Sequence, residues 1–149
     1  MRELVFPVDL DHRYSFEDLV RMGCYDWVDS TVTEVLFPFP KKKRRGTASL
    51  VLVDYPYTKQ DVTTNSLVYY AQSKKFELAQ TEHLLLFGLT YPKMQRLMHV
   101  VALGSKPRLK ASHTNVVVLT GSHQGRSLTT RHFNAEWPTR IYKFLCVKP

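Results

Sequence analysis

The sequence has few of the residues on which alternatives to an ordinary soluble domain depend. Its 149 residues include only two cysteines and six glycines. Apolar runs such as residues 84–87 fall far short of the roughly 18 residues that a membrane-spanning helix needs. The opening residues also lack the charged-then-apolar order of a signal peptide. These absences predict an intracellular protein, cytoplasmic or, if a basic run serves as an import signal, nuclear, that makes no membrane contact.

Sequence patterns for metals and cofactors are missing as well. Neither C-x-x-C nor H-x-x-x-H occurs, and Cys24 and Cys146 lie so far apart in the chain that we expect both to be reduced. The glycines at positions 121 and 125 enclose a short loop, but the Gly-Lys-Ser/Thr ending of a phosphate-binding loop is absent, which favours a hairpin turn. We therefore expect no metal, no cofactor and no catalytic residues.

The composition suits one folded domain. Hydrophobic residues make up 44% of the chain and aromatic residues 12%, enough to build a core without cross-links. Strand-like segments alternate with a few helical ones, and several strands are joined by hairpins. We expect residues 1–149 to form a single α+β domain. It would contain a mainly antiparallel sheet of about six or seven strands, with two or three helices packed on one face.

Helical signals occur in three places. Ser15 and Asp18 have the spacing of a capping box, which predicts a short helix over residues 16–22. Apolar residues recur with helical period over residues 92–103 and predict a second helix. Residues 61–80 fit either a helix or a strand, and we assign a helix. The short apolar run at residues 83–90 is instead predicted to be a central strand buried on both faces.

Strand signals fill most of the remaining chain. Alternating or β-branched residues predict strands at residues 3–8, 27–37, 47–55, 115–120, 126–133 and 139–147. Between two of these strands, Pro38 and Pro40 cannot donate to a ladder, and Gly46 permits a turn. The spacing predicts a hairpin arm over residues 30–55 that holds a basic tip.

Charge is distributed unevenly along the chain. The net charge is +8, but residues 1–40 hold 3 basic and 8 acidic side chains, whereas residues 41–149 hold 18 basic and 5 acidic ones. A strongly basic region favours a polyanionic partner. The acidic quarter is expected to be solvated, to lie against the basic remainder or to meet a basic partner.

Five consecutive cations form the tip of the predicted arm: Lys41, Lys42, Lys43, Arg44 and Arg45. Like charges this close repel one another, and they are stabilised by a phosphate backbone that releases its counterions on binding. Phe39, Tyr55 and Tyr57 lie at the base of the arm, where they could stack on unpaired bases. A solvated loop or an import signal is the alternative interpretation of this run.

A second basic group extends the predicted contact surface. Lys106, Arg108 and Lys110 are alternate residues, so extended backbone would place them on one face. Lys93 and Arg96 would continue this basic surface. No helix-turn-helix, zinc-finger or basic-zipper pattern occurs, so RNA is favoured over specific reading of duplex DNA. The sequence predicts a non-catalytic, RNA-binding protein, such as a ribonucleoprotein subunit or a phage or viral effector.

Two alternative functions remain open. The basic surface could bind an acidic protein patch, in which case the chain is an assembly protein. A metal-independent ribonuclease could instead use two histidines as acid and base; the candidates are His113, His123 and His132, with Arg126 or Arg131 to stabilise the phosphorane. Strand geometry separates Arg126 from His132 by about 20 Å, which weakens this alternative.

Overall fold

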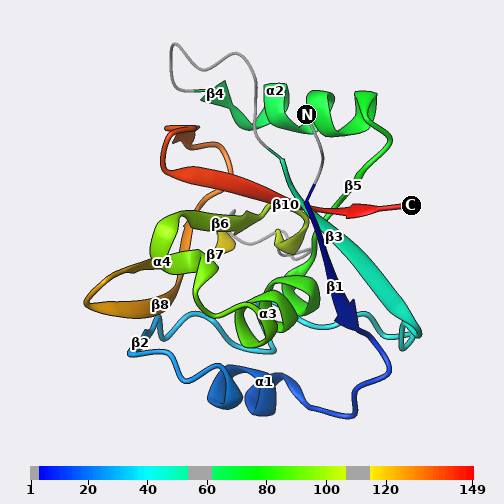
Figure 1. Ribbon diagram of the computed structural model, residues 1–149, viewed down its shortest axis with the longest axis vertical. Helices are drawn as coiled ribbons and strands as arrows, with labels where there is room; N and C mark the ends of the chain where they lie inside the picture. The colour runs from blue at the N-terminus through cyan, green and yellow to red at the C-terminus, as the bar shows by residue number, and fades with distance from the viewer. Residues whose placement is uncertain (1–3, 54–61, 107–114) are drawn as a thin grey trace.

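The computed structural model describes residues 4–53, 62–106 and 115–149 (Figure 1). The strands of this part are β1 (Val5–Asp9), β2 (Trp27–Val28), β3 (Thr47–Val53), β4 (Val62–Thr63), β5 (Glu77–Leu78), β6 (His99–Ala102), β7 (Asn115–Ser122), β8 (Gly125–His132), β9 (Glu136–Trp137) and β10 (Tyr142–Lys148). The helices are α1 (Phe16–Met22), α2 (Thr64–Ser73), α3 (Thr81–Thr90) and α4 (Met94–Leu97), with a 3-10 turn, η1 (Leu103–Ser105). None of these helices is long and apolar enough to cross a membrane.

An eight-stranded sheet organises this part of the chain. Its order is β1-β3-β10-β6-β7-β8-β2, with β5 also paired to β10. The β10–β6 and β8–β2 pairs are parallel and the other pairs of this sheet are antiparallel. A separate ladder joins β4 to β9. The predicted α+β class with a largely antiparallel sheet is confirmed.

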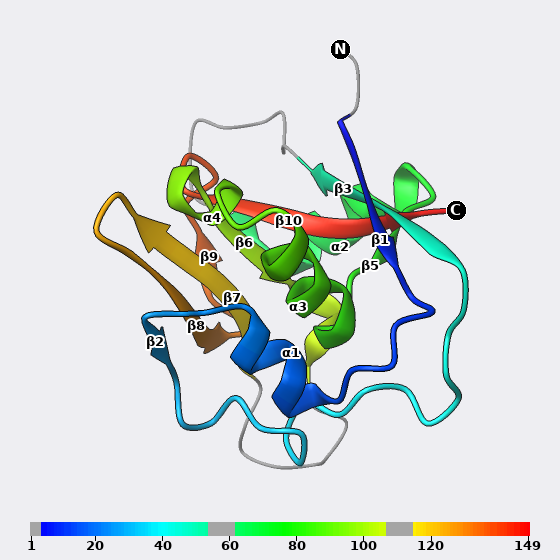
Figure 2. The same cartoon turned by 60° about the horizontal axis from the view of Figure 1, so that its bottom comes forward.

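Both faces of the sheet are covered. In β7, Val117 and Leu119 belong to the core on the side of α1 and α3, whereas Val116 and Val118 belong to the core on the side of α2. Successive strand residues point to opposite faces, so a strand that is apolar throughout contributes side chains to both cores. Figures 1 and 2 show α2 across the sheet from α1 and α3. The helices therefore do not share the single face that we expected.

Several local predictions are confirmed. Helix α1 spans the predicted residues, and its capping box is formed: Ser15 Oγ accepts from the Asp18 N–H, and the Asp18 carboxylate accepts from the Ser15 N–H. The β7–β8 hairpin and β10 match their predicted strands closely. Local capping and turn chemistry act within a few residues, which is why these elements were readable from sequence.

The predicted strand at residues 83–90 is wrong, because this segment lies in helix α3. All eight residues from position 81 to position 88 are buried, so the helix has no solvent-exposed face over these two turns. Helix α3 packs against α1, β1, β6 and β7. A short run that is apolar on every side has no periodicity with which to tell a helix from a central strand.

The predicted helix at residues 92–103 is also largely wrong. Only Met94–Leu97 is α-helical, and His99–Ala102 forms β6 between β10 and β7. In the sheet, β6 gains ladder partners on both sides, and Val100, Val101 and Ala102 become fully buried. Tertiary pairing overrides the helical spacing of the apolar residues.

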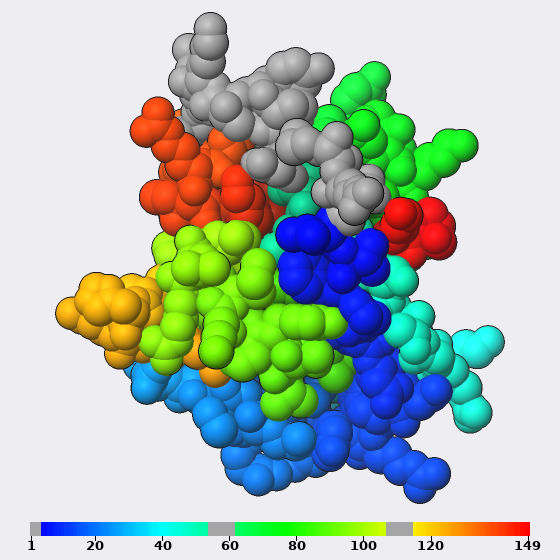
Figure 3. Space-filling view, in the orientation of Figure 1, coloured from blue at the N-terminus to red at the C-terminus, as the bar shows by residue number. Residues whose placement is uncertain are grey.

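The predicted hairpin arm does not form within residues 30–53. Strand β2 ends after two residues, and the side chain of Asp29 accepts from the N–H and hydroxyl of Thr31. Such local bonds compete with a strand ladder. Strand β3 pairs with β1 and β10 rather than with β2. The basic segment is therefore an irregular loop at the edge of the molecule, where the cyan residues lie beside the blue residues that precede α1 (Figure 3).

The packing of Gly88 in α3 leads to a stability prediction. A Cβ at this position would overlap Tyr25 Oη and lie 3.3 Å from the Leu119 methyl groups. We expect Gly88→Ala to lower the free energy of unfolding by about 1–3 kcal/mol, measured by urea denaturation. Tyr25 Oη is buried and has no hydrogen-bond partner among the described residues, so Tyr25→Phe in the same chain should restore most of the loss. A double variant no more stable than Gly88→Ala would contradict this account.

Candidate functional site

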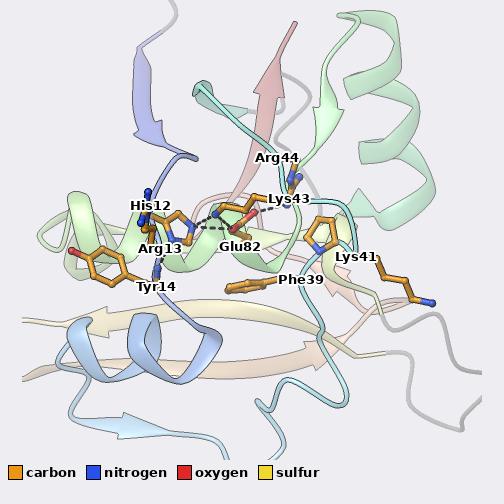
Figure 4. Close-up of a pocket in the computed structure, with 9 residues that line it drawn as sticks. His12, Arg13, Tyr14, Phe39, Lys41, Lys43, Arg44 and Glu82 are labelled. Carbon is orange, nitrogen blue, oxygen red and sulfur yellow. Dashed lines mark hydrogen bonds and ion pairs between the residues drawn. The ribbon is translucent and has the colours of Figure 1, made fainter.

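A hollow of about 280 Å³ lies where three segments distant in the sequence meet. These are the residues between β1 and α1, the residues that lead into β3, and the first turn of α3. The residues that line it are His12, Arg13, Tyr14, Phe39, Pro40, Lys41, Lys43, Arg44 and Glu82 (Figure 4). Four of these nine residues are cationic and one is a carboxylate, and the others are one histidine, two aromatic residues and a proline.

Glu82 is the centre of this arrangement. Its side chain is only 3% exposed, and a buried carboxylate is stable only when it is paired. Its Oε1 accepts from Arg44 Nη2 at 3.1 Å, while Oε2 lies 2.8 Å from His12 Nε2 and 3.6 Å from Lys43 Nζ. Glu82 also stands in the first turn of α3, where the helix dipole favours a negative charge. Each of the two other segments thus reaches α3 through this carboxylate.

His12 has both ring nitrogens engaged. Its Nδ1 accepts from the Tyr14 N–H at 3.1 Å, so Nε2 carries the hydrogen and donates it to Glu82. The nearby Lys43 Nζ is also a donor, which directs its ammonium to the carboxylate rather than to the ring. The ring of Tyr14 stacks on that of His12. His12 is therefore placed to position Glu82, and it has no free nitrogen to act as a base in this arrangement.

His83 lies beside Glu82 and faces Arg44. Its Nδ1 accepts from the Gln80 N–H at 3.0 Å, and its Nε2 is 3.0 Å from Arg44 Nη1. A neutral imidazole has one acceptor nitrogen and so cannot accept from both donors. Burial, reinforced by the charge of Arg44, lowers the pKa of His83 to about 4. His83 is consequently neutral at pH 7, and Arg44 directs its charge to Glu82.

The five-cation run is divided by these contacts. Lys43 and Arg44 pair with Glu82, and their side chains are 46% and 25% exposed. Lys41, Lys42 and Arg45 are exposed, and Figure 4 shows Lys41 extending away from Glu82. The loop is further tied down where Leu10 N–H donates to Gly46 O, and Gly46 N–H donates to the Asp11 carboxylate. The prediction of a projecting tip of five free cations is corrected to an anchored loop with three.

The described members of the second predicted basic group, Lys93, Arg96 and Lys106, do not line this hollow. Lys93 is exposed just before α4, which packs against β6, β7 and β8, and Arg96 donates to the carbonyls of Ser122 and His123. Figure 1 shows α4 at the left, beside β6 and β7, whereas β1 and β3 lie at the right of the view. Lys106 is exposed, with its Nζ 4.7 Å from the centre of the Phe133 ring. Arg108 and Lys110 lie outside the described residues.

Within the part of the chain that the structure describes, the candidate histidines of the ribonuclease alternative do not lie together. His123 lies in the turn between β7 and β8, and His132 ends β8, so they occupy opposite ends of the hairpin. His113 lies outside the described residues. Arg126 is 6% exposed and donates to the carbonyls of Gly23 and Gly88. It links α1 to α3 and cannot reach a substrate. Arg131 is directed at the Trp137 and Tyr142 rings.

The acidic centre of the site is not predicted by the sequence. The cations and Phe39 are among the expected contact residues, whereas Glu82, His12, Arg13 and Tyr14 are not. One signal was available: Glu82 and His83 are polar residues at the head of a strongly apolar run, and a charge at the edge of a buried segment requires a partner. Which residues would supply that partner depends on the fold.

Comparisons with protein-family models, with characterised proteins and with solved structures find no match to this chain. Function is therefore inferred from the geometry of the site.

The pairing of Glu82 predicts the effect of neutralising it. Glu82→Gln removes the negative charge that Arg44 and Lys43 share, replaces one acceptor oxygen with an NH2 donor, and leaves partly buried cations without a counter-charge. We expect the free energy of unfolding to fall by about 2–4 kcal/mol at pH 7, measured by urea denaturation. The exposed Glu136→Gln is the matched control and should change stability by less than about 0.5 kcal/mol. Equal effects of the two variants would contradict the central role of Glu82.

The depressed pKa of His83 predicts a pH dependence of stability. The unfolded chain takes up a proton near pH 6.5, but folded His83 does so only near pH 4. Stability is therefore highest above pH 6.5 and falls as the pH drops from there towards 4, and this loss of stability reaches about 2 kcal/mol at pH 5.

His83→Asn keeps an acceptor for the Gln80 N–H and does not titrate. Unfolding curves at pH 7.5 and pH 5 should therefore differ less for this variant than for wild type, by about that amount. His123→Asn, in the exposed β7–β8 turn, should behave like wild type. An unaltered pH dependence in His83→Asn would show that His83 is not the group responsible.

Proposed function

We propose that this protein binds nucleic acid, with single-stranded RNA favoured, through the anchored basic loop and the hollow beside it. One observation supports this proposal above the others: the pairing of Lys43 and Arg44 with Glu82 holds the loop in place while Lys41, Lys42 and Arg45 stay exposed. The proposed role is non-catalytic, as a subunit of a ribonucleoprotein or as a phage or viral effector.

Anchoring of the basic loop favours tight binding of a polyanion. A loop that is already ordered loses less conformational freedom on binding, so more of the phosphate interaction appears as affinity. Arg13 is also exposed and adds a fourth cation on the opposite wall of the hollow. Cations that no local carboxylate neutralises gain most from a polyanion that releases its counterions.

Aromatic rings favour unpaired bases over a duplex. Phe39 is half-buried and packs its ring on Phe16, with 5.4 Å between ring centres, while it also lines the hollow. Tyr14 is 46% exposed and is stacked on His12. Rings supported from behind are suitable platforms for splayed bases, and each stacked base contributes about 1–3 kcal/mol. Lys93, Arg96 and Lys106 remain a proposed separate contact area for a longer strand.

The salt dependence of RNA binding tests the proposal. Four phosphate contacts, from Arg13, Lys41, Lys42 and Arg45, predict that log affinity falls with log salt at a slope of about −3, from roughly −0.7 per contact on a single strand. Replacing Lys41, Lys42 and Arg45 with Ser should reduce the slope to about −1. Fluorescence anisotropy with a labelled oligonucleotide across a salt series measures both.

A control variant with the same loss of charge separates local contact from net charge. Lys74, Lys75 and Arg140 are exposed and line no part of the hollow, so their replacement with Ser should leave the slope within about one of wild type. Equal slopes in both triple variants would overturn the proposal. An assembly with an acidic protein that survives nuclease treatment, without any RNA affinity, would favour the alternative function instead.

A further inference from the structure

We propose that the hollow binds a phosphomonoester at the end of a nucleic-acid strand, so that the protein recognises strand termini. This inference rests on the proposed function and assigns a ligand to its central cavity. It is based on the size of the cavity, its excess positive charge, and the N–H donors of its cationic residues that are not bonded to Glu82.

The size of the hollow favours a terminus over the middle of a strand. At about 280 Å³ it lies just below the range of roughly 300–1,000 Å³ that is usual for small-molecule pockets. It can receive one phosphate with part of its nucleotide, but not a length of strand. Residues 12–14 and the basic loop form two walls of this hollow, with Glu82 of α3 between them (Figure 4).

The charge of the hollow favours a doubly ionised group. Arg13, Lys41, Lys43 and Arg44 line it, and Glu82 is the single carboxylate among its lining residues, which leaves a local excess of three positive charges. An internal phosphodiester has one negative charge, whereas a phosphomonoester has about 1.5 to 2 at pH 7 and three strong acceptor oxygens. A terminal phosphomonoester therefore neutralises the excess positive charge of the hollow better than an internal phosphodiester does.

Donors remain available for such a group. Lys43 Nζ is 3.6 Å from Glu82, a long contact that leaves ammonium hydrogens for another acceptor, and its side chain is 46% exposed. Arg13 is exposed on the opposite wall. Phosphate oxygens between Lys43 and Arg13 would receive charge-assisted bonds from both sides.

The test compares one RNA sequence in four forms by fluorescence anisotropy at low salt. They are an oligonucleotide with hydroxyl ends, the same oligonucleotide with a 5′-phosphate, the same with a 3′-phosphate, and a hydroxyl-ended oligonucleotide one nucleotide longer. The longer form matches the phosphate count of the phosphorylated ones. We expect one phosphorylated form to bind about tenfold more tightly than the longer form.

Variants assign the preference to the hollow. Lys43→Gln and Arg13→Gln should each reduce the tenfold preference to about threefold or less, because each removes a donor to the terminal phosphate. The matched control is Lys42→Gln, which is adjacent in sequence but does not line the hollow; it should weaken all four forms alike and keep the preference. Urea denaturation establishes whether each variant is folded. Because the two substitutions lie on separate segments, one variant still tests the inference if the other does not fold.

The outcomes separate this inference from the proposed function. Equal binding of the longer and the phosphorylated forms would overturn terminus recognition while leaving nucleic-acid binding intact. Failure to bind all four forms would overturn the proposed function and the inference with it. A free nucleoside monophosphate that competes as strongly as the phosphorylated strand would also overturn it, since the strand would then contribute nothing.

Discussion

The pairing of one buried carboxylate is the interaction on which the site depends. Glu82 is held in the first turn of α3 by the core that surrounds that helix, and it cannot be buried with its charge uncompensated. Its partners come from the segment before α1 and from the loop before β3. Both segments lack regular structure, and they are held by the ion pairs with Glu82 together with the hydrogen bonds of Gly46 to Leu10 and Asp11.

This constraint explains how a run of five cations is partly neutralised and partly exposed. Repulsion within the run is relieved because two of its members meet Glu82, and the remaining three are left on an ordered backbone. Residual charge on an ordered loop is suited to recognition, since less entropy is lost on binding. The aromatic rings of Phe39 and Tyr14 belong to the same ordered segments, which places stacking surfaces beside the charge.

The sheet supplies the rigidity that this site needs. Helix α3 lies on the sheet between α1 and β1, and Arg126 fastens α1 and α3 from the other end by donating to the carbonyls of Gly23 and Gly88. Guanidinium groups are well suited to this role because several donors diverge from one plane. A basic residue that seemed available for phosphate is thus used to hold the helices together, and burial is what distinguishes it from Lys41 or Lys42.

The amino-acid sequence by itself determined the α+β class, the α1 capping box, the β7–β8 hairpin and the cationic character of residues 41–45, because each depends on composition or on contacts within a few residues. The tertiary structure alone decided that residues 83–90 are helical and that β6 is a strand, since fully buried segments take their form from neighbours across the core. It also decided the site. Glu82 and His12 are 70 positions apart, and only the folding of α3 against β1 and α1 brings that carboxylate to the basic loop and leaves three of its cations exposed.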